Sequence, residues 1–391
     1  MSLRNYHIRD YDFKIILFAV LLSIIGVFAI SSAMGDTAAG HENVKKQIFG
    51  IIFGSVLMII TSLIDYHFIM KFRIPMYIFT IFILVLVMVG GHSSHNAQRW
   101  LNIGSITFQP SELAKLLLIL FLASFIMKYK DKISSFHLLL VCSALFLVPF
   151  FLVFKQPDLS TSIVLVFIFA AIMFSSGIKK RVILILMLIV IPVSVAFVSY
   201  MLNPDNDVLE GYQLKRIYGF LYPEEYPDIA YQQNNSVTAI GSGMLEGKGY
   251  KNNQITSVKN SNFLSEAETD FIFAVIGEEF GFRGASVTII LLFLVSLSCL
   301  SVGIRAKDTA GAVICAGMGT FIGVQGFMNI AVATFLMPNT GIPLPFVSYG
   351  LTSLVTLYLG LGVVLNVRLQ VKHSVNPLDE FTLNFNGKGP Y

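Results

Sequence analysis

Charged side chains are scarce in this sequence: Asp, Glu, Lys and Arg make up 13% of its 391 residues. A soluble domain carries roughly 25% charged residues, so a folded chain of this composition could not cover itself with polar groups in water. Lipid as the surrounding solvent removes that problem. The net charge of +4 is spread along the chain without a basic tract, which argues against a nucleic-acid partner.

Cysteine is also nearly absent. Cys142, Cys299 and Cys315 each lie in an apolar run, and their spacing fits neither a disulfide framework nor a zinc site. We expect three reduced core residues. The glycines between Gly243 and Gly249 lack the gap and the hydroxyl residue of a phosphate-binding loop. No Ser-His-Asp arrangement is visible, and nothing in the sequence suggests an organic cofactor.

Long apolar runs, in contrast, are abundant. A run of this kind must be long enough to cross about 30 Å of hydrocarbon as a helix. The sequence predicts an all-α polytopic membrane protein with about ten transmembrane helices, at 13–34, 47–64, 74–90, 110–127, 136–154, 160–177, 182–201, 284–303, 310–336 and 351–367. The first run is too long for the core of a signal peptide, so we expect it to be retained.

Lys and Arg in the short connections predict the orientation. The basic clusters at 128–132 and 179–181 are typical of cytoplasmic loops, which places both termini inside. Residues 1–368 would then form a single integral membrane domain, followed by a short cytoplasmic tail, 369–391. The outer connection at about 202–283 is polar, and its scattered apolar residues predict short amphipathic helices on the membrane surface.

A first polar cluster joins an outer loop to the helix that begins at Pro110. Glu112 and Lys115 share one face of that helix at i, i+3, close to its positive N-terminal end. An ordinary interpretation is a capped helix with one interfacial ion pair. Arg99 and Trp100, just before it, could equally be interface anchors.

A second cluster is the tight turn that contains Lys155 and Asp158. Asp158 could cap the helix that follows it. The cation and the acid could instead form a pair in a polar cavity at the edge of the bilayer. The turn alone does not choose between these interpretations.

Two further segments complete the outer face. Asp270 comes directly before the apolar Phe271–Phe273, where a polar loop meets a helix that we expect to face lipid. A carboxylate in that position can have a raised pKa, as a general base requires, although it could also cap the helix. Residues 338–350 hold three prolines and two glycines, which predicts a re-entrant segment buried in protein or lining a wet cavity.

In combination these segments resemble the SEDS family, whose members include RodA, FtsW and SpoVE. The resemblance covers about residues 10–370 and is carried by Gln98–Trp100, Phe108–Glu112 with Lys115, Gln156–Asp158, Thr269–Phe273 with Glu278–Glu279, and Thr340–Gly350. The Thr269–Phe273 segment and the glycines of 239–249 are similar to the RodA, or elongation, branch. Gly350–Ser353 departs from the family's usual Gly-Gly-Ser-Ser.

The resemblance implies a GT-C-like peptidoglycan glycosyltransferase of the bacterial inner membrane. It would polymerise lipid II at the outer leaflet by inverting displacement of undecaprenyl pyrophosphate, together with a class B penicillin-binding protein. Asp270 is the expected base. The expected substrate-binding residues are Arg99, Trp100, Gln109, Ser111, Glu112, Lys115, Lys155, Asp158, Glu278, Ser348 and Tyr349.

Within that set the cations Arg99, Lys115 and Lys155 would contact the diphosphate. Glu112, Asp158 and Glu278 would hold those cations in place. If Mg²⁺ or Mn²⁺ binds, the candidate ligands are Asp270, Glu112 and Asp158, because these ions prefer oxygen ligands.

Two other functions are compatible with the composition. A lipid II flippase or other transporter would also have many helices and charged residues at membrane depth. A non-catalytic scaffold would only recruit a transferase. Small residues between Gly303 and Gly319 could form a docking face for a partner's helix, or they could pack within this chain.

Overall fold

The computed structural model describes residues 11–35, 37–94, 97–103, 106–132, 135–178, 211–251, 264 and 266–371. Eight helices in this part are long and apolar enough to cross a membrane: α1 (Phe13–Ala33), α2 (Ala38–Leu63), α4 (Arg73–Gly90), α5 (Pro110–Lys128), α6 (Phe136–Phe154), α11 (Ile272–Ile304), α12 (Thr309–Ala333) and α13 (Leu351–Leu369). Helix α7 (Leu159–Ser175) is apolar but shorter. The prediction of an all-α polytopic membrane protein is confirmed. The predicted helix at 182–201 and the end of the tail lie outside the described residues.

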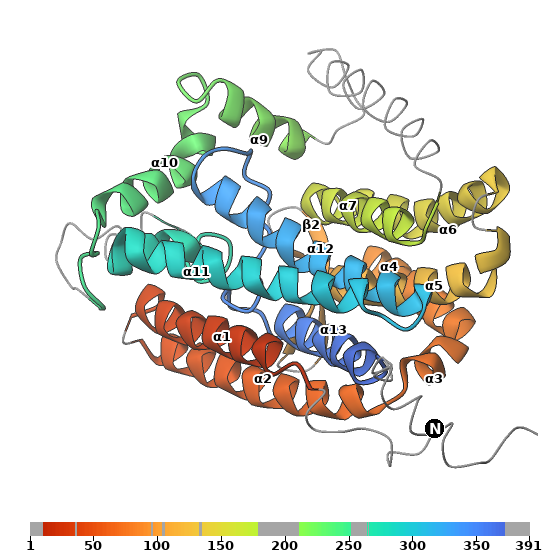
Figure 1. The fold of residues 1–391 in the computed structure, drawn as a ribbon. Coiled ribbons are helices and arrows are strands. Elements are labelled where there is room, and N and C mark those ends of the chain that lie inside the picture. Colours follow the sequence, from red (N-terminus) through yellow and green to blue (C-terminus); the bar gives the residue numbers. More distant parts are fainter. Residues whose placement is uncertain are drawn as a thin grey trace, which may run out of the picture.

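Helix α12 lies in the middle of the bundle (Figure 1). It packs against α11, α7, α5 and α13, while α2 and α1 cover α13 and α11 from the other side. Helices α5, α12 and α13 are mostly buried, whereas α4 has large exposed apolar side chains such as Phe79 and Phe82. Exposed apolar faces of this kind suit contact with lipid.

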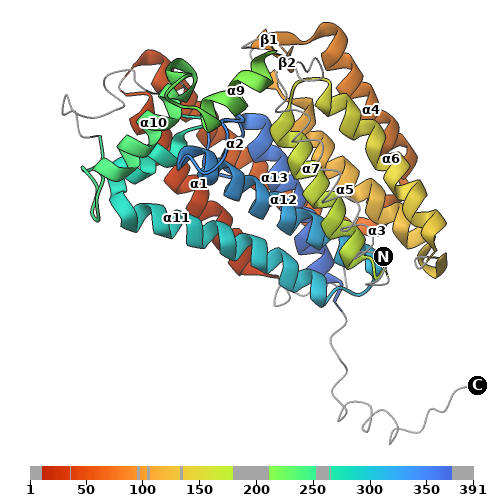
Figure 2. The same cartoon turned by 90° about the horizontal axis from the view of Figure 1, so that it is seen from above.

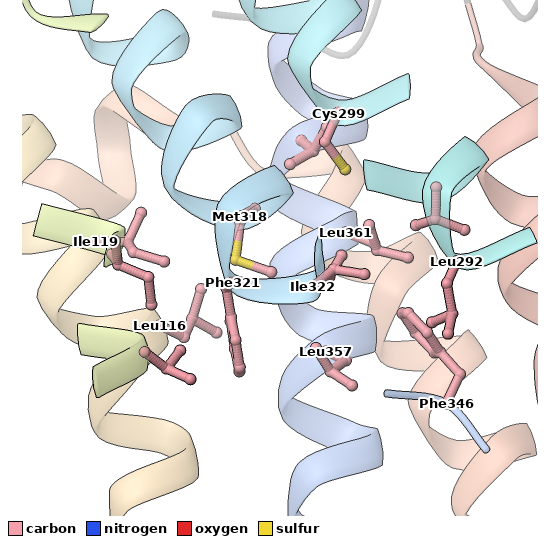
Figure 3. Packing of buried hydrophobic residues seen from close by; sticks show 14 of the residues in the cluster. Leu116, Ile119, Leu292, Cys299, Met318, Phe321, Ile322, Phe346, Leu357 and Leu361 are labelled. Carbon is pink, nitrogen blue, oxygen red and sulfur yellow. The ribbon is translucent and has the colours of Figure 1, made fainter. Parts of the chain in front are cut away.

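The centre of the bundle is closely packed around one face of α12. Met318, Phe321 and Ile322 lie between the α5 residues, such as Ile119, and the α13 residues, such as Leu357 (Figure 3). Lipid is as apolar as these side chains, so close packing rather than escape from water holds the helices together.

Glycines of α11 and α12 pack inside this chain. A Cβ added at Gly317 would lie 2.8 Å from Ile119 of α5, and one at Gly311 would lie 2.9 Å from Val367 of α13. Gly303 meets Cys315 in the same way, at 2.9 Å. These three glycines therefore pack within this chain, whereas Ala312 and Ala316 of α12 stay partly exposed, and a docking face for a partner's helix stays a prediction.

One end of the bundle carries a small sheet and two short helices (Figure 2). The antiparallel strands are β1 (His92–Ser94), β2 (Ala97–Ile103) and β3 (Ile106–Phe108). The helices α9 (Gly211–Leu221) and α10 (Pro227–Ser242) confirm that the long polar connection forms short helices. Helix α11, however, begins at Ile272, well inside the connection expected at 202–283.

The opposite end is tied together by hydrogen bonds around α3 (Tyr66–Lys71). The Tyr66 backbone N–H donates to the Asn366 side chain at 2.9 Å, and the Tyr66 hydroxyl donates to Asp308 at 2.9 Å. The 3-10 turn η3 (Lys130–Lys132) follows α5. Lys128 at the end of α5 and Arg368 at the end of α13 lie with α3 at this end, and its cytoplasmic location stays a prediction.

Candidate active site

Residues 338–350 follow α12 as irregular, buried backbone. Ile342, Leu344 and Val347 are each no more than 2% exposed, which agrees with the predicted burial inside protein. The Ser348 hydroxyl donates to the Thr269 carbonyl at 2.5 Å and accepts from the Leu344 N–H at 2.7 Å. The segment is thereby joined to the turn that precedes α11.

Asp270 lies at the end of that turn, and its side chain is half-buried. The N-cap residue of α11 is Phe271, and no side chain caps the helix there by a hydrogen bond, so Asp270 does not cap α11. Phe271 and Ile272 are 1% and 0% exposed. The first turn of α11 is thus buried in protein, while apolar side chains farther along the helix, such as Ile290 and Phe293, are exposed and suit contact with lipid. Asp270 therefore lies inside the protein without a capping role.

Charged groups from four elements surround Asp270. A Cβ added at Gly341 would lie 3.1 Å from Asp270 Oδ2 and 3.7 Å from Arg216 Nη1, so both side chains approach this glycine, whose φ is +65°. Burial raises the pKa of Asp270 to about 6. Arg216 and Arg99 oppose this shift, whereas Glu266 and Asp158 add to it. A carboxylate with this pKa can accept a proton near neutral pH.

Arg99 and Asp158, two of the charged groups near Asp270, also lie close to each other. The Arg99 guanidinium, on β2, donates to the Gln156 carbonyl at 3.1 Å and to the Pro157 carbonyl, and it lies 3.9 Å from Asp158. Asp158 also caps α7 by accepting from the Thr161 N–H at 3.1 Å. Asp158 therefore caps α7 and also lies beside a cation, Arg99 of β2.

The cation of that pair differs from the one expected. Lys155 ends α6 with an exposed side chain, and no ion pair joins it to Asp158 among the described residues. The prediction of a Lys155–Asp158 pair is wrong. Arg99 reaches the turn from β2 because the small sheet brings that strand over it, a tertiary contact that the sequence spacing does not reveal.

Lys115 and Glu112 form an ion pair deep in the bundle rather than at its interface. The Lys115 Nζ atom lies 2.6 Å from Glu112 and 2.6 Å from the Gln325 side-chain oxygen, and 4.4 Å from the centre of the Phe321 ring. Lys115 is 0% exposed and Glu112 1% exposed. The Ser353 hydroxyl donates to the second Glu112 oxygen at 2.9 Å. Every polar atom of this ion pair is thus used within the protein.

Four other predicted residues lie around these groups. The Gln109 N–H donates to the Thr352 hydroxyl at 3.4 Å. Ser111 is buried, and its hydroxyl has no hydrogen-bond partner within the described part of the chain. Trp100 is half-buried on β2. Tyr349 is half-buried, its N–H donates to the Glu268 carbonyl at 2.9 Å, and burial raises its pKa.

Glu278 belongs to a different group. Its carboxylate pairs with Lys248 at 2.8 Å, in the segment that follows α10. The hypothesis that Glu278 holds Arg99, Lys115 or Lys155 is therefore wrong. The start of α11 is helical, which carries Glu278 about two turns along from Asp270.

The predicted metal ligands do not gather into one site. Glu112 uses one oxygen for Lys115 and the other for Ser353. Over the ranges that the structure describes, no group of three or more His, Cys, Asp and Glu side chains could hold a metal ion. Glu112, Asp158 and Asp270 therefore do not fit a metal ion bound permanently by the protein.

Sequence reasoning missed Arg216, Gln325 and Asn329. The Asn329 side chain donates to the Asp270 carbonyl at 2.8 Å and to the Ile342 carbonyl at 2.7 Å. Two amides one turn apart on an apolar helix are a signal that could have been used, because polar groups inside a membrane are costly and often functional. Arg216 gave no such signal, since only the tertiary fold brings α9 to Asp270.

A match to a known protein family shows to which family this chain belongs. The family of cell cycle proteins that comprises FtsW, RodA and SpoVE matches residues 12–373. The chain belongs to this family. It is 33% identical to the peptidoglycan glycosyltransferase MrdB of Escherichia coli, over 90% of this chain and 93% of the relative. It is 32% identical to a probable peptidoglycan glycosyltransferase FtsW of Geobacter sp. strain M18, over 93% and 98%.

Solved structures share the fold. A chain from a peptidoglycan synthase complex, studied for its coordination of polymerization and crosslinking, matches with a TM-score of 0.73 and 25% identity, covering 92% of this chain and 97% of that one. The rod shape determining protein RodA of Thermus thermophilus matches with a TM-score of 0.67 and 24% identity, covering 93% and 98%. The multi-pass architecture is therefore that of the family.

Proposed function

We propose that this chain, a peptidoglycan glycosyltransferase by family, polymerises lipid II at the outer face of the bacterial inner membrane. The observation that carries the proposal is the half-buried Asp270 among the cations Arg216 and Arg99. A glycosyl transfer from a lipid diphosphate needs a base for the acceptor hydroxyl and positive charge for the leaving group. This cluster supplies both.

In this mechanism Asp270 takes the proton from the acceptor sugar hydroxyl as the new glycosidic bond forms. Arg99 and Arg216 stabilise the negative charge that develops on the departing diphosphate. Asp158 and the carbonyls of Gln156 and Pro157 hold the Arg99 guanidinium in place. A single displacement on the face opposite the leaving group inverts the α-linkage of the donor to β.

Lys115 has a less direct role in this mechanism than a diphosphate contact. Its ammonium group is enclosed by Glu112, Gln325 and Phe321, which leaves no donor directed outward in that arrangement. Its ammonium group instead holds Glu112 and Gln325 in place behind the site. Lys155 is exposed and would meet the substrate only from the membrane surface.

Mg²⁺ or Mn²⁺, if required, would arrive with the diphosphate. Such ions commonly combine one or two carboxylates with substrate phosphate oxygens and water. Addition of a chelator should then lower polymerisation while leaving the thermal midpoint of the substrate-free protein unchanged. A fall in that midpoint would indicate a resident structural ion instead.

A partner for crosslinking is the second part of the proposal. We expect a class B penicillin-binding protein, because the structural neighbour belongs to a complex that couples polymerization with crosslinking. The segment Thr269–Phe273 supports a role in elongation and cell shape. Co-purification with such a protein, and loss of rod shape on depletion, would test both statements.

One experiment distinguishes the enzyme from its rivals. Purified chain is mixed with fluorescent lipid II in detergent, where no leaflet exists to cross. Glycan strands on a gel are expected for the enzyme. No strands, together with movement of the labelled lipid across liposome membranes, would indicate a transporter, and neither result would indicate a scaffold.

A further inference from the structure

Helix α12 carries two buried amide side chains on one face, one turn apart. Gln325 is 0% exposed and Asn329 is 1% exposed. Their i, i+4 spacing places them side by side along the helix. The preceding turn of α12 carries Phe321 and Ile322, which pack among the buried apolar side chains of the bundle (Figure 3). Polar side chains in such a place need a reason, because a buried amide must find hydrogen bonds.

The two amides bind successive carbonyl groups of the same loop. Gln325 donates to the Pro343 carbonyl at 3.1 Å, and Asn329 donates to the Ile342 carbonyl at 2.7 Å. The 338–350 segment has irregular backbone, so these carbonyls have no place in a helix or a sheet. The amides therefore fix the loop against α12 at two adjacent points.

Each amide also contacts one of the ionisable groups described above. The Gln325 oxygen accepts from the Lys115 ammonium at 2.6 Å. The second proton of the Asn329 side chain goes to the Asp270 carbonyl at 2.8 Å. Lys115 comes from α5 and Asp270 from the turn before α11. Side chains of α12 therefore hold two elements that are far apart in the sequence.

The fate of the Asn329 side-chain oxygen adds an independent observation. This buried atom has no hydrogen-bond partner among the described residues. An unsatisfied acceptor costs stability, which an apolar side chain at this position would avoid. Retaining the amide thus makes sense if its donors are needed to place Asp270.

We propose that Gln325 and Asn329 are positioning residues that set the places of Lys115 and Asp270 relative to each other. The inference rests on the proposed function for its kinetic consequence. Neither amide reacts. They act by holding the Asp270 backbone and the Lys115 ammonium against one rigid helix.

Asn329→Asp is the sharpest test, because it keeps the shape of the side chain and removes its donors. Initial rates with increasing fluorescent lipid II in detergent give kcat and KM. We expect kcat to fall at least tenfold, since a displacement of about 1 Å can cost on the order of 100-fold. KM should change less than threefold. The exposed Asn234 on α10 provides the matched control, and Asn234→Asp should leave both constants unchanged.

A second variant guards against a folding defect. Gln325→Met removes both contacts of that amide without adding charge and leaves Lys115 paired with Glu112. It should also lower kcat at least tenfold per folded molecule. Hydrogen exchange of both variants should be faster in peptides that cover 266–273 and 340–346, with other regions unchanged.

The outcomes separate this inference from the proposed function. If wild type makes glycan strands and both folded variants keep kcat within threefold, the positioning role is wrong and the enzyme assignment stands. If wild type makes no strands, the enzyme assignment is wrong, and hydrogen exchange alone decides. Faster exchange at 266–273 in Asn329→Asp would then still support positioning, and unchanged exchange would overturn it.

Discussion

Among single residues, the proposed catalysis depends most on the position of the Asp270 carboxylate. Asp270 has no capping role, and its backbone is held by Asn329 from a separate helix. Two arginines, from α9 and β2, and two carboxylates are near enough to influence the pKa of its side chain. This mixture lets the group remain ionised at neutral pH while burial keeps it basic enough to accept a proton.

The raised pKa predicts the pH dependence of the rate. Asp270 must be ionised to act as a base, so the rate should rise with pH through about 6 and level off above it. Initial rates at lipid II concentrations well below KM, which report kcat/KM and thus the free enzyme, over about pH 5 to 8 check this. A rate that is flat across this range would contradict the assignment of Asp270 as the base.

The same shift makes a prediction about stability. The folded-state pKa of about 6 lies above the ordinary value of 3.8, so the folded protein binds this proton more tightly than the unfolded chain. Asp270 therefore destabilises the fold increasingly as the pH rises from about 4 to 6, and fully above that. Asp270→Asn should have a thermal midpoint at pH 7.5 at or above that of wild type. The difference in thermal midpoint, Asp270→Asn minus wild type, should be larger at pH 7.5 than at pH 4. A smaller difference at pH 7.5 than at pH 4 would contradict the raised pKa of Asp270.

The buried pair of Lys115 and Glu112 allows stability to be separated from catalysis. Lys115→Met leaves Glu112 buried without its cation and should cost roughly 3–5 kcal/mol. Adding Glu112→Gln should restore most of that stability, because a neutral pair replaces the lone charge. Polymerisation should remain lost in the double variant, because the ammonium group that holds Gln325 is still missing. Full activity in the double variant would remove Lys115 from the mechanism.

At the scale of elements, the segment after α10 braces the start of α11. The Lys248 and Gly249 N–H groups donate to the carbonyls of Glu278 and Glu279, at 2.9 and 3.1 Å. Gly281 leaves helical geometry with φ of +62°, so α11 changes direction there. The brace satisfies carbonyls that this kink removes from the helix. A glycine at 247 permits the close approach.

Substitution of that glycine tests the brace. A Cβ at Gly247 would lie 2.0 Å from the Glu279 carbonyl oxygen, at a φ of +85°. Gly247→Ala should therefore destabilise the protein by roughly 2–4 kcal/mol. Gly241, inside α10, has nothing within 4 Å of an added Cβ. Gly241→Ala should raise stability by roughly 0.5–1 kcal/mol. Thermal unfolding in detergent measures both, and equal effects would mean that the close approach is absent.

The sequence predicted helices better than their ends. The run at 136–154 matches α6 residue for residue, because polar residues bound it on both sides. Helix α11 begins earlier than expected because its first turns carry acids that looked like loop, although Glu278 and Glu279 are each 2% exposed. The small sheet was not predicted, since β1 and β3 have three residues each and no clear alternation.

For the whole molecule, we predict an orientation that places α10 outside the cell and the start of α6 in the cytoplasm. Asn234 on α10 and Ser135 before α6 are both exposed, and in the predicted topology they lie on opposite sides of the membrane. A cysteine at position 234 should react with an impermeant maleimide in intact cells. A cysteine at 135 should react only after lysis. The native cysteines are buried and should give little background. Labelling at 135 before lysis would reverse the orientation.

The composition of the site could be predicted only in part. Asp270, Arg99 and Asp158 meet as one cluster, and all three stood out as polar residues at the edges of apolar runs. Lys155 and Glu278 stood out equally but lie elsewhere, because spacing along the chain does not show which face a loop presents. Arg216 came from an element 54 residues before Asp270, and only the fold places it there.

Asp270 is assigned the proton transfer during glycan synthesis, and a comparison of three proteins tests this assignment. Wild type, Asp270→Asn and the control Asp228→Asn, from the exposed first turn of α10, are assayed with fluorescent lipid II in detergent. We predict that wild type and Asp228→Asn make glycan strands at rates within twofold of each other. Asp270→Asn should lose on the order of 10² to 10⁴ in rate at an unchanged thermal midpoint or a higher one. Strands made by folded Asp270→Asn at the wild-type rate would contradict the account.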